Sequence, residues 1–335
     1  MEASSAQNNI VNLGQAQASD LVSISSITND APDAFSLGET IVTWTAIDSS
    51  ENSATTTQTI TIIDTTPPSL ETLKNIEIEA TSSDENIISL VPPLASDSVG
   101  VVTVTNDAPR FFSMGETTVT WTAVDEQGNY ASSTQKITVI DTTPPELLLP
   151  DDIIIDAVAL ETPVNVGDAS ASDLADSTIS ITNDAPFSFS LGKTVVTWTA
   201  VDSFGNSIRA TQTINVQACG KPYSYYNMIM GSPEDDILSG TNVADLIFAE
   251  EGDDIVMGAK GNDCIFGGDG DDIIFGNEGA DNLSGGDGND VIKGQSGDDT
   301  MTGNFGVDII DGGDDNDSCN IGQDPDGDIE MKCEI

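Results

Sequence analysis

The 335-residue sequence predicts an all-β protein in which three tandem β-sandwiches precede a stacked β-solenoid. One set of motifs returns three times at a constant spacing through the first two thirds of the chain. A nine-residue unit returns ten times in the last third. Short Thr- and Val-rich segments alternate in polarity between Gly- and Pro-containing turns, and no amphipathic pattern of helical length is present.

The longer repeat defines three modules. TNDAP begins at positions 28, 105 and 182, and the Trp of WTA followed by an apolar residue and Asp lies at 44, 121 and 198. An alternating strand, a turn and a second alternating strand surround each Trp. We therefore expect β-sandwiches of roughly seven strands at 1–66, 67–143 and 144–218. The paired prolines after DTT fix backbone angles at the junctions, so a semi-rigid rod is expected.

These modules contain the pattern G-x-T-x-V-T-W-T-A-x-D-x-x-G-N, complete at 115–129 and 192–206. The pattern resembles the hyalin repeat (HYR), an immunoglobulin-like sandwich of extracellular proteins, over about residues 1–217. The resemblance implies adhesion or spacing outside the cell, without catalytic chemistry. Many HYR modules carry a cysteine pair, whereas these three carry no cysteine.

The first module is expected to lack its first strand. Residues 2–5 (EASS) align with 79–82 (EATS) after a shift by one repeat, so nothing corresponds to 69–77. A misplaced start codon or a fragment would explain this, together with the missing signal peptide. The alternative is that a neighbouring chain donates the strand, which would give head-to-tail assembly.

Ten consecutive nonapeptides occupy residues 231–320 without a slip. Glycine holds the first position in nine repeats and the fourth in seven, and the eighth position is apolar or cysteine in all ten. The sixth position is always aspartate: Asp236, Asp245, Asp254, Asp263, Asp272, Asp281, Asp290, Asp299, Asp308 and Asp317. This GGxGxDxUx pattern is identified as that of the RTX calcium-binding β-roll.

The RTX resemblance implies that two nonapeptides complete one coil, that odd and even repeats stack in separate parallel ladders, and that the ten aspartates bind several Ca²⁺ ions. Residues 231–320 carry 23 acidic residues against two lysines, a net charge of −21. About eight Ca²⁺ ions, each with oxygen ligands, would offset about 16 of these charges. We therefore expect metal binding and folding to be one event, taking place where calcium is plentiful, outside the cell.

Both ends of the solenoid are expected to be capped. Segment 219–230 contains Tyr223, Tyr225 and Tyr226 and is expected to form the N-terminal cap, a sugar-binding patch being the alternative. Segment 321–335, which contains DPDGD at 324–328, is expected to form the C-terminal cap.

The four cysteines all lie in the last third of the chain. A disulfide between Cys319 and Cys333 would clamp the last coil, and Cys219 with Cys264 is the remaining pair. Four free thiols are the alternative. Cys264 holds the seventh position, which is expected to face outward.

Other seventh positions are also apolar, namely Ile237, Leu246, Ile255, Ile273, Val291 and Ile309. They either form a packing surface for another roll or host structure, or are partly covered by neighbouring side chains.

Two aspartates, Asp64 and Asp141, precede the Thr-Thr-Pro-Pro links between modules. The simpler interpretation is a turn residue. The alternative is a cadherin-like calcium site completed by Glu77, Glu79, Asp151 or Asp152.

Composition excludes several functions. The 57 acidic and 9 basic residues give a net charge of −48, which disfavours nucleic acid and anionic membranes as partners. The sequence has no histidine, which excludes Ser-His-Asp and Cys-His catalysis and HExxH zinc sites. No apolar run approaches the ~20 residues of a membrane-spanning helix.

Two functions are consistent with these observations. The first is a non-enzymatic secreted or cell-surface structural or adhesion protein, in which a calcium-folded roll is carried on a rod of HYR modules. Its candidate partners are calcium ions, other surface proteins, glycans and copies of itself. The alternative is a fragment of a larger secreted RTX enzyme or toxin whose catalytic domain lies elsewhere. The coding sequence upstream of Met1 would distinguish them.

Overall fold

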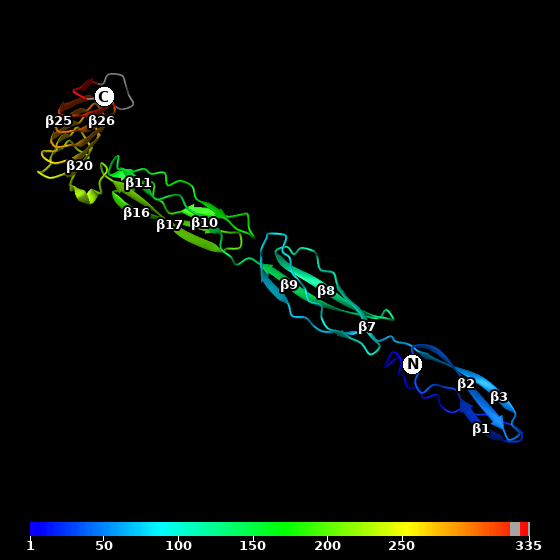
Figure 1. Cartoon of the computed structure of the whole chain (residues 1–335). Helices are drawn as coiled ribbons and strands as arrows, with labels where there is room; N and C mark the ends of the chain where they lie inside the picture. The colour runs from blue at the N-terminus through cyan, green and yellow to red at the C-terminus, as the bar shows by residue number, and fades with distance from the viewer. Residues whose placement is uncertain (322–328, 334–335) are drawn as a thin grey trace. The chain divides into compact units, whose positions relative to one another are not determined.

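The computed structural model describes residues 1–321 and 329–333, without the side chains of Val102 and Glu330. The chain forms two compact units, Met1–Thr143 with Leu174–Ser177, and Pro144–Asp173 with the chain from Thr178 onward. Regular structure is almost entirely β (Figure 1). Among the described residues, the one helical element is the 3-10 turn η1 (Tyr223–Tyr225). The predicted all-β class is confirmed.

The first unit contains modules 1 and 2. The strands of module 1 are β1 (Ile24–Asn29), β2 (Gly38–Asp48) and β3 (Ser53–Ile62), which form an antiparallel sheet in the order β1-β2-β3. Those of module 2 are β4 (Ser69–Leu70), β5 (Ile76–Glu79), β6 (Ala95–Ser96), β7 (Val101–Asn106), β8 (Gly115–Asp125) and β9 (Tyr130–Ile140). Its main sheet has the order β5-β9-β8-β7, and β4 pairs with β6 in a second, small sheet.

The strand β8 shows why these sequences fold as half-buried strands. Val119, Trp121 and Ala123 are buried, and the residues between them are partly exposed, as the two-residue period requires. The indole Nε1 of Trp121 donates a hydrogen bond to Oε1 of Gln135 in β9 over 3.2 Å. Gln135 in turn donates to the carbonyl of Lys74 over 2.8 Å, so the polar atoms brought into the core have partners.

Module 1 has no counterpart of β4 among its described residues. Where β5 runs parallel to β9 in module 2, module 1 has a single parallel bridge between Glu2 and Ile63. This matches the alignment of residues 2–5 with 79–82, which leaves the equivalent of 69–77 without a counterpart.

Module 3 lies in the second unit. Its strands are β10 (Glu146–Leu148), β11 (Ile153–Asp156), β12 (Glu161–Thr162), β13 (Ser170–Ser172), β14 (Ser180–Asn183), β15 (Phe189–Ser190), β16 (Gly192–Val201) and β17 (Ser207–Gln217). The main sheet has the order β11-β17-β16-β14, and β10 pairs with β13 as β4 does with β6. Phe189, Val196, Trp198 and Ile214 belong to its core.

The roll that follows consists of two parallel sheets. Its strands are β18 (Asn227–Met230), β19 (Ile237–Ser239), β20 (Asp245–Glu251), β21 (Ile255–Met257), β22 (Cys264–Asp269), β23 (Ile273–Glu278), β24 (Asn282–Asp287), β25 (Val291–Ser296), β26 (Thr300–Phe305), β27 (Ile309–Asp314), β28 (Ser318–Asn320) and β29 (Ile329–Met331). Even-numbered strands form the first roll sheet and odd-numbered strands the second. Paired residues belong to alternate nonapeptides, as Ile247 with Ile265, so the predicted two ladders are confirmed.

Between the two roll sheets lies a thin apolar core. It consists of the eighth-position side chains Ile247, Val256, Ile265, Ile274, Leu283, Ile292, Met301 and Ile310, all buried, together with Ala249. Leu238 and Cys319 are partly buried against it. Each coil contributes one layer, so stacking is what removes these side chains from water.

The ladder begins earlier than the nonapeptides do. β18, within the segment expected to be a cap, pairs in parallel with β20 and so forms the first layer of the first roll sheet. Tyr226 packs beside Ala218 and Leu246, and the ring of Tyr223 lies against Gly192 of β16. At the other end, β29 pairs with β27. The DPDGD sequence at 324–328 lies outside the described residues.

Seventh-position side chains differ between the two sheets. Cys264 lies on the outer face of the first roll sheet, as expected, but it is fully buried there, as is Leu246, because Ala218, Cys219 and Tyr226 cover this part of the sheet. In the second roll sheet Ile237 is 73% exposed and Ile273 is 36% exposed. No helix in the part of the chain that the structure describes is long and apolar enough to cross a membrane.

Candidate metal centre

The sixth-position aspartates stand where each turn enters a strand. Nine of them are 0–2% exposed, from Asp245 to Asp317, and Asp236 is half-buried. Burial of so many carboxylates within one small domain requires compensating partners, because an isolated ionised carboxylate is strongly destabilised away from water.

From Asp254 onward, one oxygen of each of these carboxylates has a backbone partner in the preceding coil. The N–H of Asp263 donates to Oδ1 of Asp281 over 2.8 Å, and the N–H of Asp245 donates to Oδ1 of Asp263 over 2.8 Å. The series runs from the Asp236 N–H on Asp254 to the Asp299 N–H on Asp317. Oδ1 therefore links each coil to the coil before it.

The second carboxylate oxygen remains without a hydrogen-bond partner. Buried Oδ2 atoms of this kind belong to Asp254, Asp263, Asp272, Asp281, Asp290, Asp299 and Asp317. Buried acceptors are normally satisfied, so a regular series of unsatisfied ones points to a ligand that the protein alone does not supply.

The first two repeats differ from the others. Oδ2 of Asp236 accepts hydrogen bonds from the N–H and hydroxyl of Ser232 over 2.7 and 2.8 Å. Oδ2 of Asp245 accepts the N–H of Thr241 over 2.5 Å. These two carboxylates are already satisfied, although the sequence pattern treats them like the other eight.

Glycine keeps open the space beside these unsatisfied oxygens, except at Asp254, whose repeat has Ala249 in the place of the glycine. A Cβ added to Gly258 would meet Oδ2 of Asp263 at 2.5 Å and the carbonyl oxygen of Gly276 at 2.7 Å. A Cβ on Gly285 would likewise meet Asp290 and the carbonyl of Gly303. A carboxylate oxygen and a carbonyl oxygen from the next coil thus line the same small space, which suits a hard cation that takes oxygen ligands.

Electrostatics supports the same conclusion. Burial raises the pKa of Asp272, Asp281 and Asp290 to about 7, and the charge of the aspartate in the preceding coil adds to this. Burial also raises the pKa of Asp263 and Asp299 to about 6, while backbone hydrogen bonds oppose the shift. Without a cation, ionised carboxylates in this stack therefore destabilise the fold.

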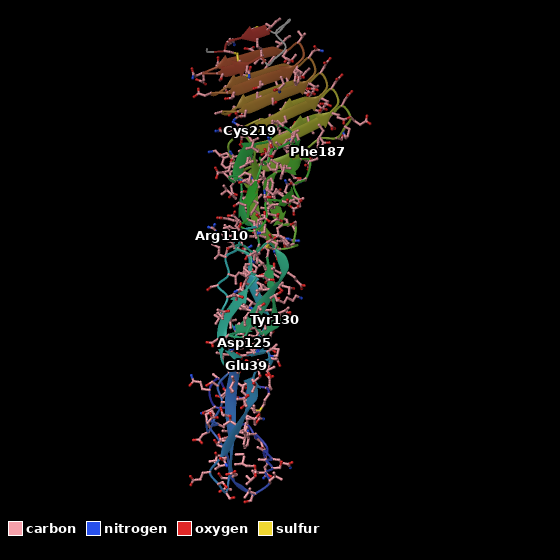
Figure 2. All side chains as sticks on the ribbon, turned by 90° about the vertical axis from the view of Figure 1, so that its right-hand side faces the viewer. Glu39, Arg110, Asp125, Tyr130, Phe187 and Cys219 are labelled. Atoms are coloured by element: carbon pink, nitrogen blue, oxygen red, sulfur yellow. A yellow bond between two sulfur atoms is a disulfide. The ribbon has the colours of Figure 1, made fainter. Side chains whose placement is uncertain are left out.

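Two disulfides hold the ends of the roll. Cys219 pairs with Cys264, with Cα atoms 6.0 Å apart, and Cys319 pairs with Cys333, with Cα atoms 5.7 Å apart. Both are the pairs expected from the sequence. Figure 2 labels Cys219, which follows β17 and joins module 3 covalently to β22.

Two of the junction partners suggested by the sequence accept hydrogen bonds from other groups. Glu79 accepts the N–H of Thr142 and the hydroxyls of Thr143 and Thr142, which lower the pKa of Glu79 to about 2. Asp152 accepts the N–H of Thr213, and Glu77 is exposed in β5. Parallel pairing of β5 with β9 brings Glu79 beside the Thr-Thr link that follows β9. Its carboxylate therefore fixes this link through hydrogen bonds.

Comparison with known families agrees with the geometry. Residues 63–139 match the HYR domain, and residues 230–265, 261–292 and 284–319 match the RTX calcium-binding nonapeptide repeat (4 copies). The chain contains an HYR domain and RTX calcium-binding repeats. The matched HYR segment covers module 2 and the preceding link. The RTX repeats indicate that this chain binds calcium.

Two curated proteins are similar in sequence to more than half of this chain. Hyalin of Lytechinus variegatus is 38% identical over 209 residues, and hyalin of Strongylocentrotus purpuratus is 40% identical over 209 residues. Each match covers 58% of this chain, but only 39% and 17% of the respective hyalin. The solved structure of Drosophila N-cadherin EC1-3 is 12% identical, covers 65% of this chain and 97% of that chain, and has a TM-score of 0.26, too low to carry over a fold or a function.

The sequence did not reveal one feature of the metal centre. The satisfied state of Asp236 and Asp245 depends on Ser232 and Thr241 at the second position. A hydroxyl at that position is the signal that could have separated the first two repeats from the rest.

Proposed function

We propose that this chain is a non-enzymatic calcium-binding structural or adhesion protein that acts outside the cell or on its surface. In this proposal the tandem HYR modules act as a spacer and the RTX roll folds when it binds several Ca²⁺ ions. The principal support is the series of buried, unsatisfied Oδ2 atoms of Asp254, Asp263, Asp272, Asp281, Asp290, Asp299 and Asp317, all but that of Asp254 lying beside a glycine.

Charge explains why folding would depend on the ion. A net charge of −21 over residues 231–320 opposes compaction, and burial adds a desolvation penalty for each ionised carboxylate. Divalent cations between the turns remove both effects together. Since the sites form only when coils stack, the free energy of binding contributes to the free energy of folding.

The proposed location follows from three observations. The chain is similar to hyalin, it contains repeats of the RTX calcium-binding type, and it has two disulfides. Disulfides persist in oxidising compartments, which are mainly extracellular. The absence of histidine supports the non-enzymatic part of the proposal, because it removes the commonest general base.

Calcium titration of the metal-free full chain tests the proposal. We expect strand content measured by circular dichroism to rise with Ca²⁺ and to fall again when EGTA is added. Asp272→Asn should raise the calcium midpoint, whereas Asp271→Asn should leave it almost unchanged. Asp271 is the matched control, because its exposed carboxylate accepts hydrogen bonds from Asn289. Strand content that EGTA does not alter would refute calcium-dependent folding.

A further inference from the structure

The link between modules 1 and 2 contains a buried carboxylate that the roll does not explain. Asp64 is only 7% exposed, and its Oδ2 atom is buried without a hydrogen-bond partner. Its Oδ1 atom accepts the N–H of Thr66 over 3.1 Å. Burial raises the pKa of the Asp64 carboxyl, and the charges of Asp97, Asp125 and Glu2 raise it further.

Asp97 and Asp125 come from separate parts of module 2. Asp97 directly follows β6, and its Oδ1 atom accepts the N–H groups of Val99 and Gly100 over 2.7 and 3.3 Å. The Val99 side chain packs against the core of module 1, which places this loop at the junction. Asp125 ends β8 and is labelled in Figure 2.

Asn129 connects the link directly to Asp125. Its Nδ2 donates to Oδ2 of Asp125 over 2.8 Å and to the carbonyl oxygen of Asp64 over 3.1 Å. Asn129 thereby holds the link and the β8–β9 turn together, because its amide bonds both the Asp64 carbonyl and the Asp125 carboxylate. Neither ion pair found among the described residues, Lys136 with Glu116 and Lys260 with Glu278, neutralises these carboxylates.

We propose that Asp64, Asp97 and Asp125 bind a Ca²⁺ ion at the junction of modules 1 and 2. The donor atoms are carboxylate and carbonyl oxygens, the ligands preferred by calcium. Histidine is absent from the chain and Cys219 is its first cysteine, so softer metals lack their usual ligands in these two modules. The ion supplies the partner that the buried Oδ2 atom lacks and cancels the repulsion among the three carboxylates.

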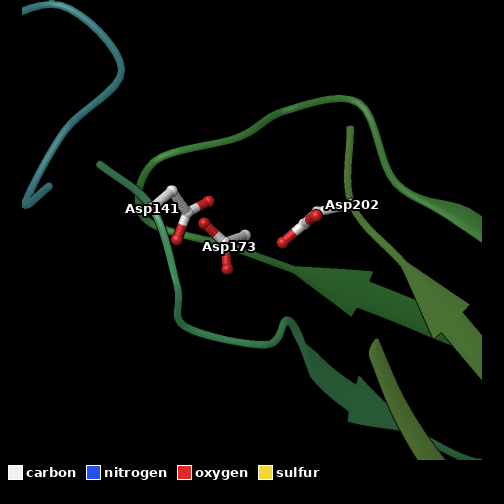
Figure 3. A group of neighbouring side chains, drawn as sticks. All are labelled: Asp141, Asp173 and Asp202. Carbon is white, nitrogen blue, oxygen red and sulfur yellow. The ribbon is translucent and has the colours of Figure 1, made fainter. Parts of the chain in front are cut away.

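Module 3 repeats two of these three positions. Asp173 directly follows β13, as Asp97 follows β6, and Asp202 follows the WTA motif of module 3 as Asp125 follows that of module 2. The carboxylates of Asp173 and Asp202 have oxygen atoms within 4.8 Å of each other (Figure 3). The arrangement thus belongs to the module as a unit. After module 3, the position that corresponds to Asp64 is Ala218, where the chain enters the roll.

Module 1 provides a matched control. Asp48 holds the same turn position as Asp125, and Asn52 donates hydrogen bonds to both of its oxygens. Asp48 is half-buried at the turn, and the side-chain hydrogen bond from Asn52 lowers the pKa of its carboxyl. Asp48→Asn therefore removes an equivalent turn carboxylate without touching the proposed ion.

Hydrogen–deuterium exchange of the full chain, followed peptide by peptide, tests the site separately from the roll. At a Ca²⁺ concentration about ten times the dissociation constant, peptides covering 94–101 and 123–131 should exchange about 10-fold more slowly than in EGTA. Asp64→Asn should abolish this calcium effect, and Asp48→Asn should retain it. Unchanged exchange in the wild type, or a calcium effect that survives Asp64→Asn, would overturn the proposal.

The metal-free state distinguishes an ion ligand from a merely structural carboxylate. In EGTA, Asp64→Asn should protect these peptides at least as well as the wild type, since it removes a buried charge. Faster exchange of the variant in EGTA would show a structural role and contradict the proposal. Peptides from 231–320 report on the roll in the same experiment, so its failure to respond would count against calcium-dependent folding alone.

Discussion

The backbone N–H of Asp263 donates to Oδ1 of Asp281, 18 residues later, over 2.8 Å. This contact assigns different tasks to the two oxygens of one side chain. Oδ1 holds adjacent coils in register, and Oδ2, which has no hydrogen-bond partner, is the oxygen that we propose for the ion. An amide can keep the first contact and carries no charge for the second, so Asp→Asn substitutions test the two tasks separately.

Substitution of an aspartate in the middle of the roll should weaken calcium binding more than substitution of the first aspartate. Asp281→Asn is expected to raise the calcium midpoint by at least about tenfold, equivalent to about 1.4 kcal/mol. Asp236→Asn should change it much less, because Ser232 already satisfies Asp236 Oδ2. Isothermal titration calorimetry on both variants measures the difference. Equal effects of the two substitutions would contradict the distinction between early and later repeats.

The metal-free roll should become more stable on acidification. Burial raises the pKa of Asp281 and Asp290 to about 7, above the ordinary 3.8. A raised folded-state pKa gives stability that is present below the unfolded pKa and is lost as the pH rises through the folded value. In EGTA, urea unfolding should therefore show higher stability at about pH 4.5 than at about pH 7.5.

The calcium-loaded roll provides the control for this pH effect. Its stability should change in the opposite direction, because protons compete with Ca²⁺ for the same carboxylates. If the metal-free roll were equally stable at both pH values, the buried carboxylates would not be the source of its instability.

Truncation of one side chain in the thin apolar core should destabilise the calcium-loaded roll. Ile274 is fully buried between the roll sheets, and Ile274→Ala should cost about 2–5 kcal/mol. Ile273, its neighbour on the outer face, is 36% exposed, and Ile273→Ala should cost less than about 1 kcal/mol. Urea unfolding in excess calcium compares the two. A larger loss of stability for Ile273→Ala than for Ile274→Ala would contradict the assignment of Ile274 to the core.

The second disulfide should stabilise the last coil. Cys319 and Cys333 are 14 residues apart, a loop whose closure contributes about 3 kcal/mol in the chain-entropy model. A Cys319→Ser, Cys333→Ser variant should show faster hydrogen exchange in 309–320 at the same calcium concentration. The Cys219→Ser, Cys264→Ser variant is the control, and its last coil should be unaffected. Equal exchange in both variants would mean that the disulfide does not stabilise this coil.

Local repetition explains which features could be predicted. The sixth-position aspartates and the apolar eighth positions recur in every nonapeptide, so their common face follows from sequence alone. The burial of Cys264 could not be predicted, because it depends on Ala218 and Tyr226, which precede the repeats. The effect of Asp97 and Asp125 on Asp64 was missed because these residues lie far along the chain, and only the packing of the sandwich brings their charges to it.

The disulfide between Cys219 and Cys264 has a mechanical consequence. It encloses the four strands from β18 to β21 in a covalent loop whose two cysteines are 45 residues apart. Tension applied through module 3 passes from Cys219 directly to β22, so the first layers of the solenoid carry none of the load. Extension under force would begin only in the coils beyond Cys264, where bound ions and backbone hydrogen bonds must resist it.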